Sequence, residues 1–499
     1  METAVDALLR LGLQLRDSGC YAPAAKCLLA VCRSNALPAT IATARLLLGQ
    51  LLLDHTRELS QAKEHLTAAA LQLLGHAFLY VHLNDYQAAT TVLKQCHALL
   101  DSLPDKHTRE TRQLEAHLLM LGVSLTLARG SLKDLDLDDN RSSSMMVQLQ
   151  QLMGGLENHE WAYSLMPARQ VEATVAMLQA TAYRSVGKLA PANAFLQRAE
   201  QLVDQQLAEL RFALEKTEGA LNPHALWAGK GCAQLKVLIL QQHALSALTT
   251  TAFTEAAQHI SDLIGILQRF PTLMRDFIPS VQMLQGHYAH GLGELAIAAS
   301  HFRAVLDCDA CASLHPAAAA TAALCELKLD SKQSGVGRAI ELLDCVAPDS
   351  GKDFAAWSDK ALHQLVSSLV ALRQGDAATA KVQLARTLKI SHNTIGNSQL
   401  VGVVLVALAP VQLDKGDSSG ASALLDSAFT ILRGIHDMPS VVACVDAMVA
   451  LQERLGNTDK AAKHRVYGER KARELQGLLV TARAAEAHQL VLNWTPMQQ

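Results

Sequence analysis

Aromatic residues are scarce in this chain: phenylalanine, tryptophan and tyrosine together make up 4% of its 499 residues. β-Sheets draw on aromatic and β-branched side chains, whereas close-packed helices are built from alanine and leucine, which dominate here. Proline (13 residues) and charged residues (18%) are also few, and half of the chain is hydrophobic. These proportions exclude a long disordered protein and predict an all-α protein with a large buried core.

A strong net charge is missing as well. Lysine and arginine number 44 against 47 aspartate and glutamate residues, so no global field draws the chain onto nucleic acid or an anionic membrane. The longest apolar run, Leu400–Leu413, is shorter than the roughly 20 residues that span a bilayer and contains Pro410, so we expect a core helix there. The first residues include Glu2 and Asp6 and lack the basic start of a secretory signal. This predicts a cytosolic or nuclear protein whose ten cysteines are mostly reduced.

An internal repeat with a period near 41 residues is visible in the C-terminal half. Six alanines follow one another at spacings of 41, 41, 41, 41 and 40 residues: Ala257, Ala298, Ala339, Ala380, Ala421 and Ala461. A small residue lies five positions before each of them: Ala252, Gly293, Ser334, Gly375, Gly416 and Gly456. Four of the six copies have a large apolar residue four positions after the alanine: Phe302, Leu343, Leu384 and Leu425. Such a period is typical of solenoids built from helix pairs.

Each period is interpreted as a helix, a tight turn and a second helix. Glycine tolerates the left-handed backbone conformation that ends a helix, and a following polar residue, as in Gly375-Asp376 or Gly416-Asp417, caps the next helix. The alanine marks the closest approach of the two helices. Because a helix pair cannot bury its apolar faces alone, we expect the pairs to stack into a tetratricopeptide-like, right-handed superhelix.

The same pattern is irregular in the N-terminal half. Copies are centred on Ala24, Ala62, Ala89 and Ala192. The 27 residues between Ala62 and Ala89 are too few for a complete helix pair. Aspartates and serines over 134–144 indicate an acidic polar loop. We therefore expect four parts: N-terminal repeats over 1–128, this loop over 129–161, the superhelix over 162–475, and a C-terminal helix and tail over 476–499.

The strongest metal-binding candidate is Cys308-x2-Cys311, with His301 and His315 nearby. One such cysteine pair is only half of a usual zinc site, and no second pair follows at the required spacing. The alternative is that both cysteines pack at the end of a second helix. We favour this alternative and expect neither a metal nor a cofactor.

Other catalytic motifs are incomplete. His159-Glu160 begins like a zinc-protease helix, but Tyr163 replaces the second histidine. Gly229-Lys230-Gly231 and Gly335-Val336-Gly337 lack the Gly-Lys-Ser/Thr of a phosphate-binding loop, so we interpret these glycines as turns. No nucleophile elbow or kinase set accompanies the histidines. An enzyme is therefore disfavoured.

The stretch from Arg454 to Arg473 carries a modest basic excess. Nucleic-acid binding is one interpretation, but Tyr467 is the one aromatic residue there for bases to stack on. A solvated helix face is the alternative that we favour.

Several segments resemble one known family. The small residue, the alanine five positions on and the apolar residue nine positions on are similar to the second half of a tetratricopeptide repeat. More specific are residues 46–66 (LLLGQLLLDHTRELSQAKEHL), 252–264 (AFTEAAQHISDLI), 414–440 (DKGDSSGASALLDSAFTILRGIHDMPS), 455–464 (LGNTDKAAKH) and the Asn493-Trp494-Thr495 sequence near the end. Together they resemble the smaller, tetratricopeptide-like subunit of the cohesin loading complex, the MAU-type sister chromatid cohesion factors.

This resemblance implies a non-enzymatic adaptor of the nucleoplasm and chromatin, with the cytoplasm as a second location. Such a subunit wraps the extended N-terminal segment of a large HEAT-repeat partner, the adherin or Nipped-B type protein, and helps to place cohesin on chromatin for sister chromatid cohesion. Such a subunit reaches cohesin and chromatin through that complex. The resemblance implies neither a membrane partner nor a small-molecule substrate. A long solenoid has a continuous concave surface that suits an extended peptide.

The geometry of stacked helix pairs also suggests contact residues. First helices line the concave face of such solenoids, which would project Arg184, His287, His290 and Arg373 toward a bound segment. The alternative is that these residues lie on outer faces or cap helices. For the whole chain, the second interpretation is another tetratricopeptide scaffold, such as a complex subunit or a chaperone-binding adaptor.

Overall fold

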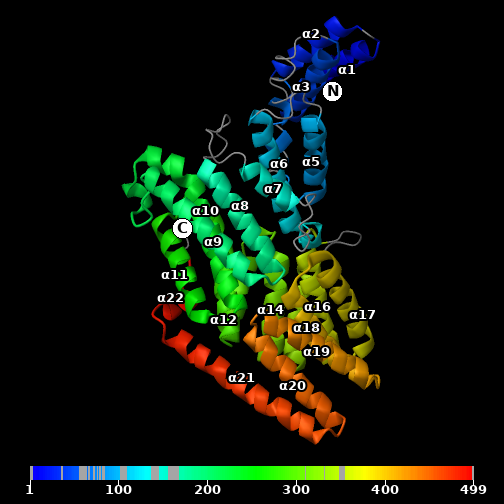
Figure 1. Cartoon of the computed structure of the whole chain (residues 1–499), viewed down its shortest axis with the longest axis vertical. Coiled ribbons are helices and arrows are strands. Elements are labelled where there is room, and N and C mark those ends of the chain that lie inside the picture. Colours follow the sequence, from blue (N-terminus) through cyan, green and yellow to red (C-terminus); the bar gives the residue numbers. More distant parts are fainter. Residues whose placement is uncertain are drawn as a thin grey trace. The chain divides into compact units, whose positions relative to one another are not determined.

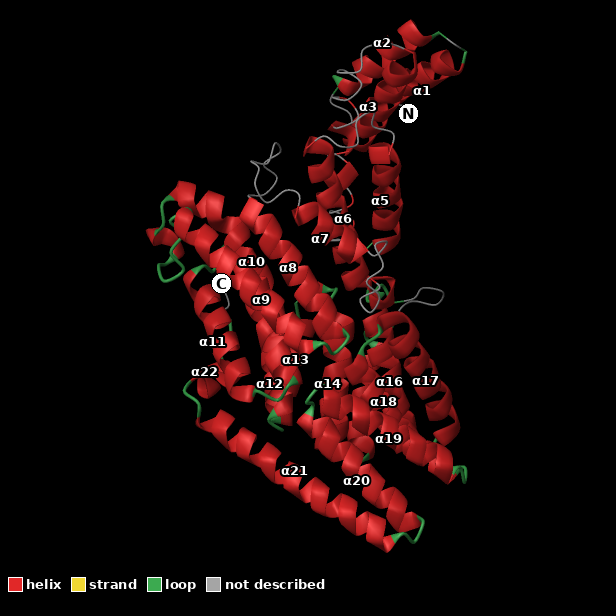
Figure 2. Cartoon of the chain, in the orientation of Figure 1, coloured by secondary structure: helices red, strands yellow, loops and turns green. Residues whose placement is uncertain are grey.

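The computed structural model describes residues 4–18, 20–34, 38–55, 65, 68–70, 73–75, 77, 80, 85–101, 109–135, 145–154, 168–308, 311–330, 332–347 and 354–496. These residues form helices joined by turns, and none of them lies in a β-strand (Figure 2). The chain divides into two compact units, the first comprising residues 1–129 and 138–168 and the second 130–137 and 169–499. The predicted all-α fold class is confirmed.

The first unit contains α1 (Ala4–Asp17), α2 (Tyr21–Cys32), α3 (Pro38–His55), α5 (Tyr86–Asp101), α6 (Arg109–Arg129) and α7 (Met145–Gly154). Helix α2 packs between α1 and α3, with Leu28 and Leu48 in the shared core. Helix α5 packs on α6 around Leu93, and the predicted repeat alanines Ala24 and Ala89 are buried. Ala62, and with it the short spacing to Ala89, lies outside the described residues.

The second unit is a series of helix pairs that follow one another along the chain (Figure 1). Its first helices are α8 (Ala168–Ser185), α10 (Pro223–Thr249), α12 (Ile278–Gly291), α14 (His315–Leu329), α16 (Trp357–Arg373), α18 (Ser398–Asp414) and α20 (Met438–Arg454). Its second helices are α9 (Leu189–Glu209), α11 (Phe253–Arg269), α13 (Leu295–Leu306), α15 (Gln333–Asp344), α17 (Ala377–Ile390), α19 (Ser418–Gly434) and α21 (Thr458–Ala484). The remaining elements are α22 (Ala487–Asn493) and the short helical turns η1 (Leu132–Leu135), η2 (Glu218–Ala220), η3 (Arg275–Phe277) and η5 (Ser391–Ile395).

The turns between paired helices confirm the predicted repeat. Gly293, Gly375 and Gly416 are left-handed, with φ of +81°, +82° and +84°. The carboxylates of Asp376 and Asp417 cap α17 and α19 by accepting backbone N–H groups three residues on, at 2.9 and 2.8 Å. All six repeat alanines are buried, as are the four large apolar residues that follow them. The second unit is therefore a tetratricopeptide-like solenoid.

Two of the small residues assigned to turns have different places. Thr251, with φ of +59°, is the left-handed residue between α10 and α11, and Ala252 follows it as the N-cap of α11. Ser334 lies inside α15, after a turn that contains Asp330. The pairing of helices at both places is preserved without a glycine at the predicted position.

The interpretation of two glycine clusters as turns is wrong. Gly229 and Gly231 lie inside α10, and Gly335 and Gly337 lie inside α15. A Cβ atom at Gly229 would collide with the Phe212 ring, and one at Gly231 would lie 2.7 Å from Nε2 of Gln170. The glycines in α10 therefore give neighbouring side chains room to pack against the helix, a role that local sequence does not reveal.

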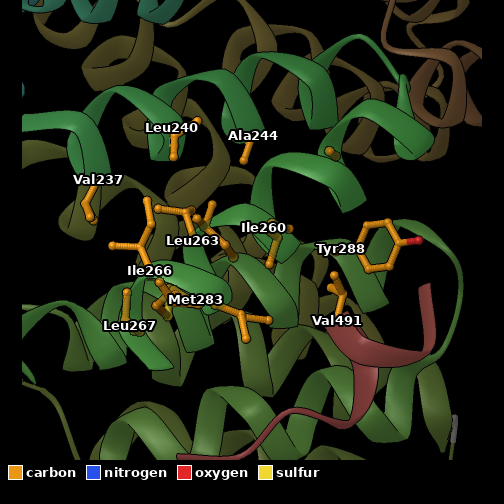
Figure 3. Close-up of a cluster of buried hydrophobic side chains, with 14 of the residues drawn as sticks. Val237, Leu240, Ala244, Ile260, Leu263, Ile266, Leu267, Met283, Tyr288 and Val491 are labelled. Carbon is orange, nitrogen blue, oxygen red and sulfur yellow. The ribbon is translucent and has the colours of Figure 1, made fainter. Parts of the chain in front are cut away.

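The end of the chain returns to the middle of the second unit. Gln285 of α12 donates to the carbonyls of Val491 and Trp494 at 2.6 and 3.0 Å. The Tyr288 hydroxyl lies 3.1 Å from Nδ1 of His488. Figure 3 shows Val491 of α22 beside Tyr288, next to the apolar side chains that join α10, α11 and α12. Helix α22 thus completes the core of this region.

The two ends of the series of pairs also meet. The Ser398 hydroxyl donates to the Val186 carbonyl at 2.9 Å, although the residues are 212 positions apart. Gly187 approaches Ile435 so closely that a Cβ there would lie 2.8 Å from its Cγ2 atom. The second unit therefore closes on itself, with the turn after α8 resting against the turns before α18 and α20.

The predicted parts compare with the structure as follows. Residues 136–144 and 155–161 of the predicted 129–161 loop lie outside the described residues, while η1 and α7 lie within that segment. The predicted boundary at residue 475 falls inside α21. Among the described residues, no helix is both long and apolar enough to cross a membrane. The apolar run at Leu400–Leu413 is the core helix α18, as predicted.

Candidate partner-binding face

Three side-chain hydrogen bonds connect consecutive first helices. Arg184 Nε of α8 donates to Oε1 of Gln242 of α10 at 3.1 Å. Gln241 Nε2 of α10 donates to the hydroxyl of Ser280, in the first turn of α12, at 2.5 Å. Lys328 Nζ of α14 lies 2.8 Å from Nε2 of His290 of α12. We call the surface that these residues share on α8, α10, α12 and α14 the inner face.

Side chains on the inner face reach solvent and are nevertheless surrounded by protein. Burial lowers the pKa of Arg184 to about 10 and that of His287 to about 4. Burial, reinforced by the charge of Lys328, lowers the pKa of His290 to about 3. All three residues keep partial solvent exposure. Each of these three groups is therefore partly exposed, while neighbouring protein atoms remove much of its hydration.

His287 has a fixed place on this face. It lies one turn before His290 on α12, and its ring meets the edge of the Phe302 ring with centroids 5.2 Å apart. Its neighbour Tyr288 points instead to α22. The predicted contact residues Arg184, His287 and His290 therefore lie on first helices of the solenoid, where the sequence analysis expected them.

Arg373 occupies a different setting. It is the last residue of α16 and is exposed, and among the described residues it forms no hydrogen bond or ion pair. Arg373 takes no part in the hydrogen bonds that define the inner face. It remains a predicted contact on a first helix.

The sequence interpretation missed Lys328 as well as Gln242 and Ser280. Lys328 is in the last turn of α14, just as Arg184 is in the last turn of α8 and His290 in that of α12. Aligning the ends of the first helices would have found it. Gln242 and Ser280 carry no such signal, because each is recognised only by the side chain of the neighbouring helix that donates to it, Arg184 and Gln241 respectively.

An apolar hollow of about 290 Å³ lies among α18, α19 and α20. It is lined by Val406, Ala409, Pro410, Leu413, Ala421, Leu425, Ala447, Ala450, Leu451 and Arg454. Pro410 and Ala450 are exposed at its rim. Because proline has no N–H, the carbonyl of Val406 lacks the helical donor it would otherwise have. The hollow is thus lined mainly by apolar residues, with the charged Arg454 among them.

The cysteine motif lies between α13 and α14. The two sulfur atoms of Cys308 and Cys311 are 3.6 Å apart, and Nε2 of His315 lies 3.1 Å from the Cys308 carbonyl. His301 instead faces the carbonyl of Leu492 at 3.0 Å. In the described part of the chain, no group of three or more histidine, cysteine or acidic side chains is placed to hold a metal. Residues His159 to Tyr163 lie outside the described range.

The basic C-terminal helix α21 uses several of its charges within the protein. Arg465 pairs with Glu453, Lys471 with Glu474 at 2.6 Å, and Arg483 with Glu294 at 3.2 Å. Arg470 also stacks over the Tyr467 ring, 5.1 Å from its centroid. These contacts support the interpretation of a solvated face.

The fold defines the class of protein: an all-α, tetratricopeptide-like solenoid of stacked helix pairs. The chain belongs to the cohesin loading factor family, whose model matches residues 69–413. The family resemblance seen in the sequence is thereby confirmed.

One curated relative is the sister chromatid cohesion protein SCC4 of Arabidopsis thaliana. It is 24% identical over 442 residues, which cover 83% of this chain and 60% of the plant protein. The chain therefore spans less than two thirds of that relative. Among solved structures, a Rap protein complexed with competence and sporulation factor has a TM-score of 0.47 at 11% identity, covering 82% of this chain and 99% of that one. The Cut9-Hcn1 hetero-tetramer has a TM-score of 0.37 at 13% identity, covering 96% of each chain.

Proposed function

We propose that this chain is the non-enzymatic adaptor subunit of the cohesin loading complex. In this role it holds the extended N-terminal segment of the large HEAT-repeat loader subunit and promotes cohesin loading onto chromatin in the nucleus. The observation that carries the proposal is the family match over residues 69–413. That range includes every first helix from α8 to α16 and nearly all of α18.

The inner face suits an extended segment. An extended peptide exposes backbone N–H and C=O groups, and the amide, hydroxyl and basic side chains on the inner face offer donors and acceptors for them. The hollow among α18, α19 and α20 accepts an apolar side chain of the same segment. Such binding buries a large area without catalysis, and the segment pays its ordering entropy on binding.

The contacts we assign to the partner are Arg184, His287, His290 and Arg373. Arg184 is desolvated and retains its charge at neutral pH, because even its lowered pKa is about 10. A desolvated cation forms stronger pairs with anions than an exposed one does. We therefore assign to Arg184 a larger share of the binding energy than to the exposed Arg373.

The test is binding to the large loader subunit of the same organism. The two chains are co-expressed and analysed by size-exclusion chromatography, and their affinity is measured for Arg184→Glu together with Arg373→Glu. We expect one-to-one co-elution for the wild type and a loss of affinity of at least tenfold for the double variant, whose melting temperature is measured to show that it still folds. Arg386→Glu on the second helix α17 is the matched control, and it should retain wild-type affinity.

The opposite outcomes are equally clear. Separate elution of the two wild-type chains would refute the proposed role. Co-elution with equal affinity for the double variant and the control would retain the role and move the contact surface away from these arginines.

A further inference from the structure

A cluster of three basic side chains bridges α12 and α14 on the inner face. Lys328 Nζ lies 2.8 Å from Nε2 of His290, and His287 is one turn earlier on the same side of α12. An ammonium group can only donate, so Nε2 of His290 accepts from it. The edge-on contact with Phe302 holds the His287 ring beside this pair.

No carboxylate balances the cluster. Among the described residues, no ion pair joins Lys328, His290 or His287 to an aspartate or glutamate, and the two groups whose charge acts on His290, Lys328 and His287, are both basic. This contrasts with the next cluster along the chain, where Arg303 and Arg338 share Glu326. Burial lowers the pKa of His287 to about 4 and that of His290 to about 3, so both rings are neutral at pH 7 and the exposed Lys328 is the charged member of the cluster.

We propose that His287, His290 and Lys328 form a carboxylate-binding site that takes one aspartate or glutamate side chain of the bound segment. The inference rests on the proposed function, since it names the chemistry of the segment at this point of the inner face. Lys328 has three N–H donors, of which one goes to His290, so two remain for a carboxylate. His287 supplies a further N–H from the neighbouring turn.

A simpler explanation is that Lys328 only complements the dipole at the end of α14. The geometry argues against it. The ammonium reaches across to α12 and binds a side chain there, and no hydrogen bond to a carbonyl of α14 is among its contacts. The Lys328 ammonium lies beside two histidines and has no carboxylate partner. This setting suits the binding of an external anion better than it suits interaction with the dipole of α14.

The experiment measures whether one carboxylate and Lys328 act together. Overlapping synthetic peptides that tile the N-terminal segment of the large loader subunit are tested against the full chain by fluorescence anisotropy. Each aspartate and glutamate of the strongest binder is then changed to its amide. We expect one amide peptide to bind the wild-type chain about tenfold more weakly, which is the usual scale for a charge-assisted hydrogen bond.

The variants decide the assignment. The Lys328→Gln variant should bind the acidic peptide more weakly than the wild type does, by about the same factor as the amide change. It should bind the acidic peptide and its amide form with equal affinity. Lys328→Arg, which keeps the charge, should retain the distinction. Lys389→Gln on the second helix α17 controls for the loss of a lysine elsewhere, and melting temperatures show that each variant folds.

Two results overturn the inference and are distinguishable from each other. If a tiled peptide binds but Lys328→Gln distinguishes every acid from its amide as the wild type does, the carboxylate site is wrong and the adaptor role stands. If no tiled peptide binds the wild-type chain, the carboxylate site fails, and the proposed function fails with it when the two full-length chains also elute separately.

Discussion

The Thr251 hydroxyl donates a hydrogen bond of 3.2 Å to the carbonyl of His436, which lies 185 positions further along the chain. Both residues are left-handed, with φ of +59° and +60°. This conformation costs a residue other than glycine roughly 1–2 kcal/mol. Two strained turns that meet each other are held by the surrounding packing, so the closure of the second unit is a specific feature of its fold.

Glycine at residue 436 should stabilise the protein. His436 is exposed, and its carbonyl rather than its side chain accepts from Thr251. His436→Gly removes the left-handed strain, keeps that carbonyl, and should raise the free energy of unfolding by about 0.5–1 kcal/mol after the added chain entropy is counted. Urea denaturation measures it. His464→Gly, inside α21, is the control and should lower stability by about 1 kcal/mol. Equal losses in both variants would contradict the strain at residue 436.

Gly187 tests how much the closure contact contributes. Gly187→Ala places a methyl group 2.8 Å from Ile435 on a backbone with φ of +84°. Gly293→Ala has nearly the same φ, +81°, but meets nothing within 4 Å. In the control, the strained backbone alone should lower the free energy of unfolding by about 1–2 kcal/mol. Gly187→Ala should lower it by at least about 1 kcal/mol more, because the methyl group is overpacked against Ile435. Equal losses would show that the turn after α8 moves away from Ile435 without cost.

The repeat itself could be predicted because its causes are local. A glycine, a capping aspartate and a buried alanine lie within a few residues of each other, so their spacing exposes the helix pair. Gly375, Asp376 and Ala380 show this in one turn. Each follows from backbone geometry that does not depend on distant parts of the chain.

What could not be predicted depends on residues far apart. Gly229 looks like a turn until Phe212 is seen against α10. Lys328 looks like an ordinary helix-end lysine until His290 lies beside it. Closure joins Ser398 to Val186 over 212 residues, and no periodic pattern encodes that contact. The fold class was therefore accessible from sequence, whereas the composition of the inner face was only partly so.

Lys236 should be important for the stability of the α9–α10 contact. Its side chain is 11% exposed, and its Nζ lies 2.9 Å from Oε1 of Glu200 and 2.6 Å from Oδ1 of Asp204. Lys236→Met leaves both carboxylates without their cation. We expect a loss of about 2 kcal/mol at neutral pH, less than for a fully buried pair because the carboxylates reach solvent. Calorimetric unfolding measures the loss, and Lys230→Met at an exposed site of α10 should change stability little.

The pH dependence of that loss has a definite sign. The ring of His243, whose Nε2 lies 3.3 Å from Oε2 of Glu200, and the ammonium of Lys236 together lower the pKa of Glu200 to about 2. A carboxylate with a lowered pKa stabilises the folded state above its unfolded pKa of about 4.3, and this contribution is lost as the pH falls through 2. The penalty of Lys236→Met should accordingly shrink below pH 4. A penalty independent of pH would show that packing of the lysine stem, and not its charge, matters here.

Asp359 should behave in the opposite way. It lies in the first turn of α16, and burial raises its pKa to about 6. A group with a raised pKa stabilises the folded state while it is protonated, so its contribution is present below the unfolded pKa of about 3.9 and is lost as the pH rises through 6. At pH 7.5 the folded protein therefore holds a carboxylate that its surroundings disfavour.

Asp359→Asn removes that charge and should raise the free energy of unfolding at pH 7.5 by about 1 kcal/mol, after subtracting the favourable effect of a carboxylate at a helix N-terminus. At about pH 3 the variant and the wild type should be nearly equal, because Asp359 is then protonated in both the folded and the unfolded protein. Urea titrations at the two pH values measure the difference. Asp376→Ala, which deletes the cap of α17, should lose about 1 kcal/mol at pH 7.5 and so serves as a control of opposite sign. If Asp359→Asn is destabilised at pH 7.5 like this control, Asp359 acts as a helix-capping charge and its burial is compensated by solvent.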